Sequence, residues 1–255
     1  MSRIWTGLSI VLVLILLAMV SQTSAPSTRA AEQNKGVPAV SGSVDAPRVA
    51  GSWSALAKGT NGAALALASK GNTMYVGGTF LLANAVVNTS RIASWDGTNW
   101  SALGSGLNGT VDALAVDASG ILYAGGRFTQ AGGDVNANYI AKWNSSTNTW
   151  SALGLGVTGP VFAIAISGSN VYVGGSFMQA GGVPSGTNSI AKWNSSTNTW
   201  SALGSGLNNQ VNSMAVDGTN LYVGGMFTQA DGTANGDGVA KWNGTSWSAL
   251  GTGLT

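Results

Sequence analysis

The sequence predicts an all-β protein, a β-propeller of four-stranded antiparallel blades, and two observations carry that prediction. One is a phrase, Trp-Ser-Ala-Leu, that recurs at spacings of 47, 50, 50 and 47 residues. The other is a set of four strand-like segments within each repeat. A unit of this kind cannot bury both of its faces alone, so it must stack on copies of itself, as propeller blades do. The five copies of the phrase begin at Trp53, Trp100, Trp150, Trp200 and Trp247.

The repeat that contains Trp150 illustrates the four predicted strands. Turn-forming residues close the first and the last pair of strands, at Asp117–Gly120 and Ser145–Asn148. The loop between the two middle strands, Thr129–Asn138, is the longest of the three. The predicted strands cover residues 111–116, 121–128, 139–144 and 149–154.

The first strand of each repeat alternates small and large side chains. In one repeat Ala113 and Ala115 share a face, and Leu114 and Val116 share the other. Blades converge toward a central axis, where the space between neighbouring faces is smallest. The alternation therefore predicts that this strand is the innermost of its blade.

Two further features repeat with the same period. The second strand ends in a glycine pair, which predicts a β-bulge or a close approach of a neighbouring backbone. The third strand ends in tryptophan, and these rings are expected inside the blade-to-blade contacts. The glycine pairs begin at Gly77, Gly125, Gly174 and Gly224, and the third-strand rings are Trp95, Trp143, Trp193 and Trp242.

Counting strands predicts four blades plus one spare outer strand, and hence an incomplete ring. The phrase at Trp53 precedes the first inner strand and belongs to none of the four blades. A ring would use it to complete a further blade, whose other strands would follow Thr255. The open edges of the terminal blades then predict self-association. The expected blades span about 63–104, 111–154, 161–204 and 211–251.

The N-terminus has the pattern of a signal peptide covering residues 1–25. Arg3 precedes an apolar run of 13 residues, Leu8–Val20, and small residues end at Ala25. An uncleaved anchor is the alternative, and it would be the chain's one link to a membrane. Residues 26–52 are predicted to be a flexible linker. We therefore expect a protein that is secreted or held at the cell surface.

Composition excludes several functions. From Trp53 onward seven Lys and Arg balance seven Asp, so no basic stripe is available for nucleic acid. The chain contains no histidine and no cysteine, which excludes disulfides, imidazole or thiolate metal sites and the usual nucleophilic triads. We expect no cofactor, no metal and no enzymatic activity. Asp117 and Asp217 are assigned to turns, and the loop acids Asp134 and Asp231 leave calcium as a weaker alternative.

The candidate binding residues are amides on the long loops between the second and third strands. These loops should emerge on the same rim as the connections that contain Asn108, Asn208 and Asn209. Amides repeated around a rim could bind sugar hydroxyls, or each could bond its own loop backbone. The candidates are Gln130, Gln179, Gln229, Asn138 and Asn188.

The order Leu-Tyr-Ala-Gly-Gly at 122–126, Ile-Ala-Lys-Trp-Asn at 140–144 and Thr-Trp at 149–150 resembles the repeats of kelch-type propellers. The phrases at 172–177, 190–193 and 200–204 are closer still to Rax2-like cortical marker repeats and related bacterial secreted repeats. The resemblance covers residues 53–255. A kelch-type enzyme, galactose oxidase, binds copper through His and Tyr and carries a Tyr-Cys cross-link, which this chain cannot build. Propellers of this kind have many functions, so the resemblance does not select one. The signal-like N-terminus, the repeats, the neutral surface and the lack of catalytic residues together favour a non-catalytic interaction or adhesion scaffold for an extracellular protein or glycan. A lectin-like propeller with one weak site per blade is the alternative.

Overall fold

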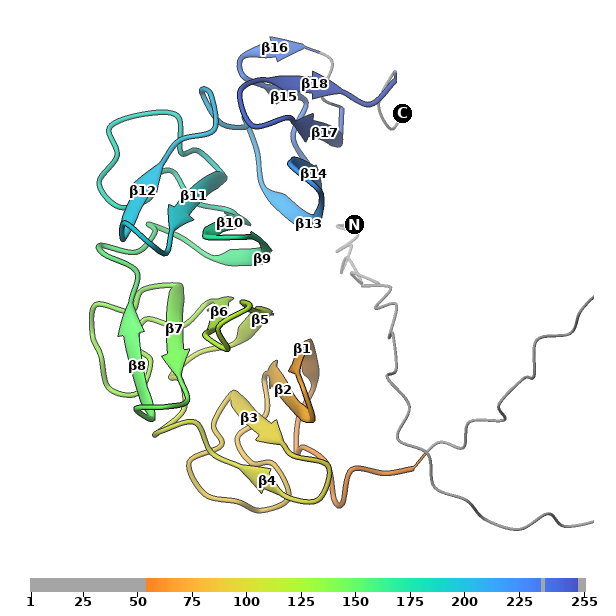
Figure 1. The fold of residues 1–255 in the computed structure, drawn as a ribbon, viewed down its shortest axis with the longest axis vertical. Helices are drawn as coiled ribbons and strands as arrows, with labels where there is room; N and C mark the ends of the chain where they lie inside the picture. Colours follow the sequence, from red (N-terminus) through yellow and green to blue (C-terminus); the bar gives the residue numbers. More distant parts are fainter. Residues whose placement is uncertain (1–53, 235–236, 252–255) are drawn as a thin grey trace, which may run out of the picture. The chain divides into compact units, whose positions relative to one another are not determined.

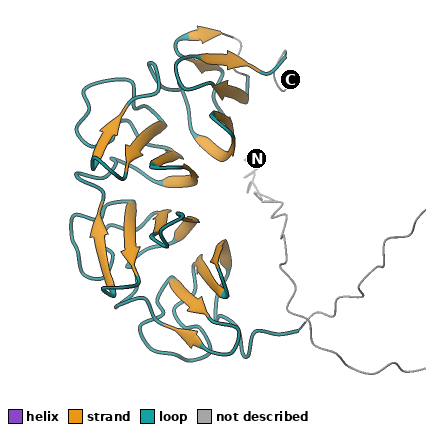
Figure 2. Ribbon diagram, in the orientation of Figure 1, coloured by secondary structure: helices purple, strands orange, loops and turns teal. Residues whose placement is uncertain are grey.

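The structure is a computed structural model that describes residues 54–234 and 237–251. The chain divides into two units, Met1–Gly51 and Ser52–Thr255. The predicted signal peptide and linker, and Trp53 itself, lie outside the described residues. The described part of the second unit is all-β (Figure 2). It contains no helix, and therefore none that could cross a bilayer.

Four separate four-stranded antiparallel sheets make up this unit (Figure 1). The first blade contains β1 (Ala64–Lys70), β2 (Thr73–Gly78), β3 (Ile92–Trp95) and β4 (Trp100–Ser101). The second contains β5 (Val111–Val116), β6 (Leu122–Gly126), β7 (Ile140–Asn144) and β8 (Thr149–Ala152). The third contains β9 (Val161–Ser167), β10 (Asn170–Gly175), β11 (Ile190–Asn194) and β12 (Thr199–Ser201). The fourth contains β13 (Val211–Asp217), β14 (Asn220–Gly225), β17 (Val239–Trp242) and β18 (Trp247–Ala249), and its long loop holds a small hairpin of β15 (Gln229–Ala230) and β16 (Thr233–Ala234).

The first strand of each blade is the innermost, as the alternation of side chains predicts. In each sheet the strands pair in chain order, with the first strand at one edge and the fourth at the other. The first strands contact one another in succession, β1 with β5, β5 with β9 and β9 with β13. Figure 1 shows β1 and β13 as the two ends of this series. Within the described residues the blades form an incomplete propeller rather than a closed ring.

The glycine pair serves both purposes that the sequence predicts for it. In the second blade Gly126 pairs with Val111 and Gly125 with Ala113, which leaves Asp112 as the extra residue of a bulge. A Cβ on Gly126 would lie 2.0 Å from the Thr110 carbonyl oxygen, inside the same blade. A Cβ on Gly125 would lie 2.4 Å from Val161 Cγ1, on the next blade. The first glycine therefore admits the neighbouring blade, and the second admits the blade's own bulged strand.

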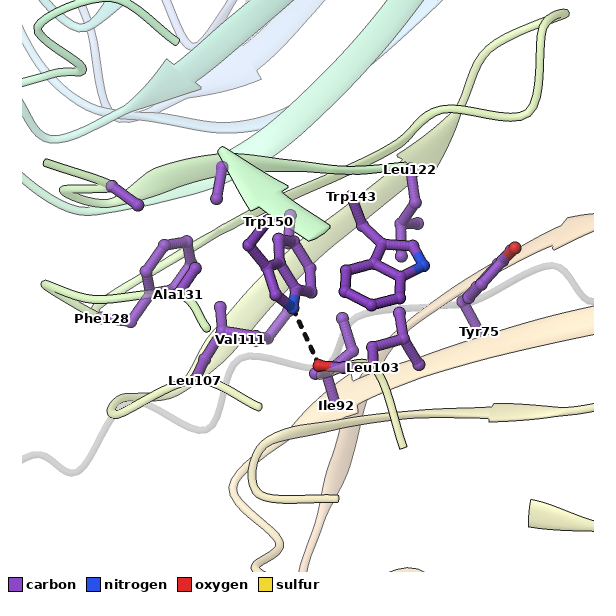
Figure 3. Close-up of a cluster of buried hydrophobic side chains, with 13 residues drawn as sticks. Tyr75, Ile92, Leu103, Leu107, Val111, Leu122, Phe128, Ala131, Trp143 and Trp150 are labelled. Carbon is purple, nitrogen blue, oxygen red and sulfur yellow. Dashed lines mark hydrogen bonds between the residues drawn. The ribbon is translucent and has the colours of Figure 1, made fainter. Parts of the chain in front are cut away.

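The contact between consecutive blades is a cluster of buried apolar side chains, shown for blades one and two in Figure 3. The earlier blade contributes a tyrosine, an isoleucine and the leucine of the repeated phrase. The later blade contributes its bulge valine and two tryptophans whose ring centroids lie 5.4 Å apart. Trp143 and Trp193 are buried, which confirms the predicted place of the third-strand rings. The residues named in these roles are Tyr75, Ile92 and Leu103 of blade one and Val111, Trp143 and Trp150 of blade two.

A hydrogen bond between neighbouring repeated phrases accompanies each apolar contact. Trp150 Nε1 donates to the Leu103 carbonyl at 2.9 Å (Figure 3). The same bond joins Trp200 to Leu153 and Trp247 to Leu203. Because the indole N–H is removed from water, a protein acceptor makes its burial less costly.

The spare N-terminal phrase participates in this series through its last residue. Ser54–Leu56 is not in a strand, because no third strand lies beside it in the described part of the chain. The carbonyl of Leu56 nevertheless accepts a hydrogen bond from Trp100 Nε1 at 3.1 Å. Leu56 also packs against the cluster at the start of blade one. Leu56 therefore gives Trp100 of blade one the same hydrogen-bond acceptor that the phrase leucine of each blade gives the phrase tryptophan of the next.

Candidate functional site

The long loops between the second and third strands hold all five candidate binding residues. In the second blade the loop is closed by its own backbone: Tyr139 N–H donates to the Phe128 carbonyl at 2.9 Å, and Gly126 N–H donates to the Tyr139 carbonyl at 3.0 Å. Phe128 is fully buried beneath the loop. Equivalent bonds close the loops of the other three blades. Each loop therefore has a fixed base from which its remaining side chains project.

Connections between blades meet these loops on one rim, as the sequence predicts. Asn108, on the connection into blade two, accepts backbone N–H bonds from Thr129 at 2.9 Å and Gln130 at 3.0 Å through its Oδ1. Its Nδ2 donates to Thr129 Oγ1 at 2.9 Å. Asn208 makes the same three bonds in blade four. These amides hold the loops in place, and their hydrogen-bonding groups are occupied by the chain itself.

The three glutamines differ in what their side chains contact. Gln179 is half-buried, and its Nε2 donates to the Val183 carbonyl at 3.2 Å, as expected if the amide bonds its own loop. Gln130 and Gln229 are exposed, and their side-chain amides make no hydrogen bond within the described residues. The three side chains lie on three different blades. Two of the three are thus available to a ligand.

The two candidate asparagines are bonded through their backbones. The Asn188 carbonyl accepts a bond from Leu207 N–H at 3.1 Å, and Asn138 N–H donates to the Asn136 carbonyl at 2.9 Å. The side chain of Asn188 is exposed and that of Asn138 is half-buried. Neither side-chain amide forms a hydrogen bond in the part of the chain that the structure describes.

The loop acids bond to the chain. Asp134 accepts N–H bonds from Asn136 at 2.9 Å through Oδ1 and from Ala152 at 3.2 Å through Oδ2. Asp231 Oδ1 accepts bonds from the backbone and hydroxyl of Ser205. No cluster of three or more His, Cys, Asp or Glu side chains occurs in residues 54–234 and 237–251. Asp134 and Asp231 thus each accept hydrogen bonds from the chain itself.

Asp117 has the turn role that the sequence predicts for it. Its Oδ1 accepts backbone bonds from Ser119 at 2.9 Å and Ile121 at 3.0 Å, and its Oδ2 lies 3.3 Å from the Tyr123 hydroxyl. Burial and then the Asp117 charge raise the pKa of Tyr123 to about 12. Tyr123 therefore stays protonated at physiological pH. Asp217 is exposed at the end of β13.

Exposed apolar side chains on the same rim are the feature that sequence reasoning missed. Met178 and Val87 are 84% and 71% exposed, and Val135 is also exposed. Leu155, on a connection, lies 3.3 Å from the place of a Cβ on Gly182 in the adjacent loop. A signal was available, because Met178 stands where two other repeats have Thr129 and Thr228. Blade one carries Leu81 at the same position, also exposed, so an exposed apolar residue recurs here in two of the four loops.

The described residues contain one ion pair, between Arg127 and Asp112, and it lies at a blade contact. Arg127 Nε is 3.2 Å from Asp112 Oδ2, and its guanidinium carbon is 5.2 Å from the ring centroid of Phe162 on the next blade. Burial raises the pKa of Asp112, and the Arg127 charge opposes that rise. Because the arginine is largely exposed, the pair contributes little to stability.

These features define a repeat module of propeller type, with blade contacts as its core and a loop rim as its variable surface. No protein-family model matches the chain, and no curated protein matches it. Among solved structures it is similar to the computationally designed Ika4 protein, with a TM-score of 0.48, 19% identity, and coverage of 72% of this chain and 93% of that one.

Two natural structures show a likeness of the same order. One is the extracellular domain of the BT4673 one-component system from B. thetaiotaomicron, with a TM-score of 0.47, 14% identity, and coverage of 73% of this chain and 22% of that one. The other is a chain of the Mitotic Checkpoint Complex, with a TM-score of 0.44, 18% identity, and coverage of 74% and 49%. This chain therefore spans less than half the length of either.

Proposed function

We propose that this chain is an interaction or adhesion scaffold at the cell surface or outside the cell, acting without catalysis and binding a protein through its loop rim. The observation that carries the proposal is the set of exposed apolar side chains on the rim, Val87, Val135 and Met178 among them. Protein contacts commonly use apolar anchors surrounded by polar residues, which is the composition of these loops.

The residue inventory supports a role without catalysis. The chain has no histidine and no cysteine. Among the acids of the long loops, Asp134 and Asp231 accept hydrogen bonds from the chain itself. The resemblance to kelch-type and Rax2-like repeats and the signal-like N-terminus agree with a scaffold that is exported.

A lectin-like function is the second candidate, and the exposed amides of Gln130 and Gln229 favour it. Repetition of a weak site would supply avidity. Against it, the amides of Asn108 and Asn208 are used to hold the loops, and Gln179 bonds its own loop. Fewer periodic amides are free than the sequence alone indicates.

The two candidates separate in one binding experiment with the full chain. The chain is immobilised and exposed to cell-envelope fractions of its source organism, which are untreated, protease-treated or oxidised with periodate. Two matched variants accompany it: V87S/V135S/M178S removes exposed apolar groups, and Q130A/Q229A removes free amides. All five positions are exposed, so neither variant should alter the fold.

A protein-binding scaffold predicts that protease treatment abolishes binding and that the apolar variant weakens it about tenfold or more, the loss of roughly one well-buried contact. The amide variant should bind normally. Loss of binding after periodate and in Q130A/Q229A would assign the lectin function instead. Equal binding by both variants and by the unaltered chain would contradict the loop rim as the binding surface. Repeating the assay on a glycan array with and without calcium tests the lectin candidate separately.

A further inference from the structure

In blades one to three, one face of the sheet is covered by the next blade, and in blade four no other part of the described chain covers this face. A Cβ on Gly224 would meet only Ser213 Oγ at 2.8 Å and the Gly238 carbonyl at 3.9 Å, whereas Gly125 meets side chains of the next blade. Leu250 is 38% exposed, although the equivalent Leu153 is fully buried. Within the described residues, blade four therefore exposes the face through which the other three blades contact the next blade.

The opposite face of blade one, which in the other blades contacts the preceding blade, is exposed within the described residues. Ala64 is exposed, whereas the equivalent residues Val111 and Val161 are fully buried against a preceding blade. Leu67 is exposed, and its equivalent Leu114 packs into the contact between blades one and two. Blade one thus presents the other half of the same interface.

These two faces hold the positions that form the two halves of a contact within the chain three times, with Ala64 in place of the inserting valine and Ser213 in place of the alanine beside the glycine. In each internal contact the first glycine of one blade receives a valine of the next, at Gly77 with Val111, Gly125 with Val161 and Gly174 with Val211. We infer that the face of blade four binds the face of blade one on a second copy of this chain, so that copies associate head to tail. Because the contact is heterologous, it generates rings or open chains of copies.

Ser54–Leu56 sets a condition on this association. Leu56 already provides the acceptor for Trp100, the position that Leu250 of the incoming copy would take. Association therefore exchanges the Leu56 carbonyl for the Leu250 carbonyl at the same indole N–H. The hydrogen bond is conserved in this exchange, and the gain comes from covering Leu67 and the face around Gly224.

Site-specific disulfide formation tests the contact, since the chain has no cysteine of its own. In the internal contacts the glycine Cβ position lies 2.9 to 3.0 Å from the valine Cβ. A disulfide places these atoms about 3.8 Å apart, so a small shift permits the bond. Full-length chains carrying Ala64→Cys and full-length chains carrying Gly224→Cys, with different tags, are mixed under oxidised glutathione. Thr219→Cys, on an exposed turn of blade four, replaces Gly224→Cys in the control.

The inference predicts a mixed dimer of the Ala64→Cys and Gly224→Cys chains in several-fold excess over either homodimer and over the Thr219→Cys control. The disulfide forms only where positions 64 and 224 of two chains meet, so association through residues 1–53 alone would not produce it. Equal yields in all mixtures, or no dimer, would overturn the inference. So would an intramolecular bond in a chain that carries both cysteines, because blade four would then pack on its own blade one.

Two matched leucine variants test whether Leu250 of a second copy replaces Leu56 at the Trp100 indole. Leu250→Ala should reduce the mixed-dimer yield about tenfold, the effect of one lost leucine contact. Leu56→Ala should leave the yield unchanged or raise it, because it weakens the competitor. A fall in yield with Leu56→Ala and none with Leu250→Ala would show that Leu56 stays in place, and the inferred contact would be wrong.

Discussion

The contact between blades two and three and the uncovered face of blade four use nearly the same residues with opposite results. Tyr123 is 1% exposed at the contact, whereas Tyr222 is partly exposed on blade four. The glycine of the same position is enclosed by Val161 and Ile164 in one case and open in the other. Burial in this molecule is therefore a property of the neighbouring blade rather than of the repeat. Substitutions in each glycine pair separate packing within a blade from packing between blades. The first glycine faces the next blade, and the second faces the first strand of its own blade.

The largest loss of stability is expected for substitutions of the second glycine of each pair. Here blade two and blade four should be affected equally. A methyl group on Gly126 or Gly225 would lie 2.0 or 2.2 Å from a carbonyl oxygen of the same blade, and backbone cannot yield cheaply. We expect Gly126→Ala and Gly225→Ala each to cost about 3 kcal/mol of stability. Urea unfolding followed by tryptophan fluorescence measures both. A much smaller cost at Gly225 would mean that the bulge of blade four differs from the others.

The first glycine should distinguish the two regions. Gly125→Ala pushes against Val161 of the next blade and should cost about 2 kcal/mol. Gly224→Ala meets only the movable hydroxyl of Ser213 and should change stability by less than about 0.5 kcal/mol. The same unfolding experiment compares them, with the chain diluted until light scattering shows a single copy. Equal costs would show that something covers blade four in solution.

The tryptophans offer a smaller comparison within the blade contacts. Trp150 Nε1 donates to Leu103, whereas Trp193 Nε1 is buried with no partner in the described residues. Both phenylalanine variants lose ring volume, but only Trp150→Phe also leaves a carbonyl without its donor. We expect Trp150→Phe to cost about 1 kcal/mol more than Trp193→Phe. The reverse order in thermal unfolding would assign a hydrogen-bond acceptor to the Trp193 N–H.

The smallest effect concerns the hairpin between the third and fourth strands, where blade one has Asp96 and blade two has Asn144. Hydrogen bonds from the backbone of Asn99 and then of Thr98 lower the pKa of Asp96 below its ordinary 3.8. A group with a lowered pKa in the folded state contributes stability above its unfolded pKa and loses it as the pH falls through the folded value. The amide signals of Thr98 and Asn99 should therefore shift below pH 4. In Asp96→Asn those shifts should disappear, and their persistence would point to another titrating group.

Repetition made most of the fold predictable from the sequence, and departures from repetition carried most of what was missed. The inner strand, the glycine pair and the buried Trp143 follow from local pattern, because each recurs in the same register. The acceptor role of Leu56 could not be predicted, since it depends on where the chain enters blade one. The amide of Asn108 was expected on the rim, but only the geometry of its loop shows that it is occupied. Met178 departs from the repeat only beside the repeated Gln179, and its exposure depends on the fold of the loop rather than on the repeat pattern.

Tyrosine nitration tests most directly the claim that each blade is buried by the next. The full chain, diluted until light scattering shows a single copy, is treated with tetranitromethane, and the modified residues are identified by mass spectrometry. Burial raises the pKa values of Tyr75 and Tyr172, and that of Tyr123 to about 12, so these three should resist a reagent that attacks the phenolate. We expect Tyr222, on the face of blade four that no other described residue covers, to be modified well before them. Protection of Tyr222 equal to that of Tyr123 in the dilute chain would contradict it, because the face of blade four would then be covered from within the same molecule.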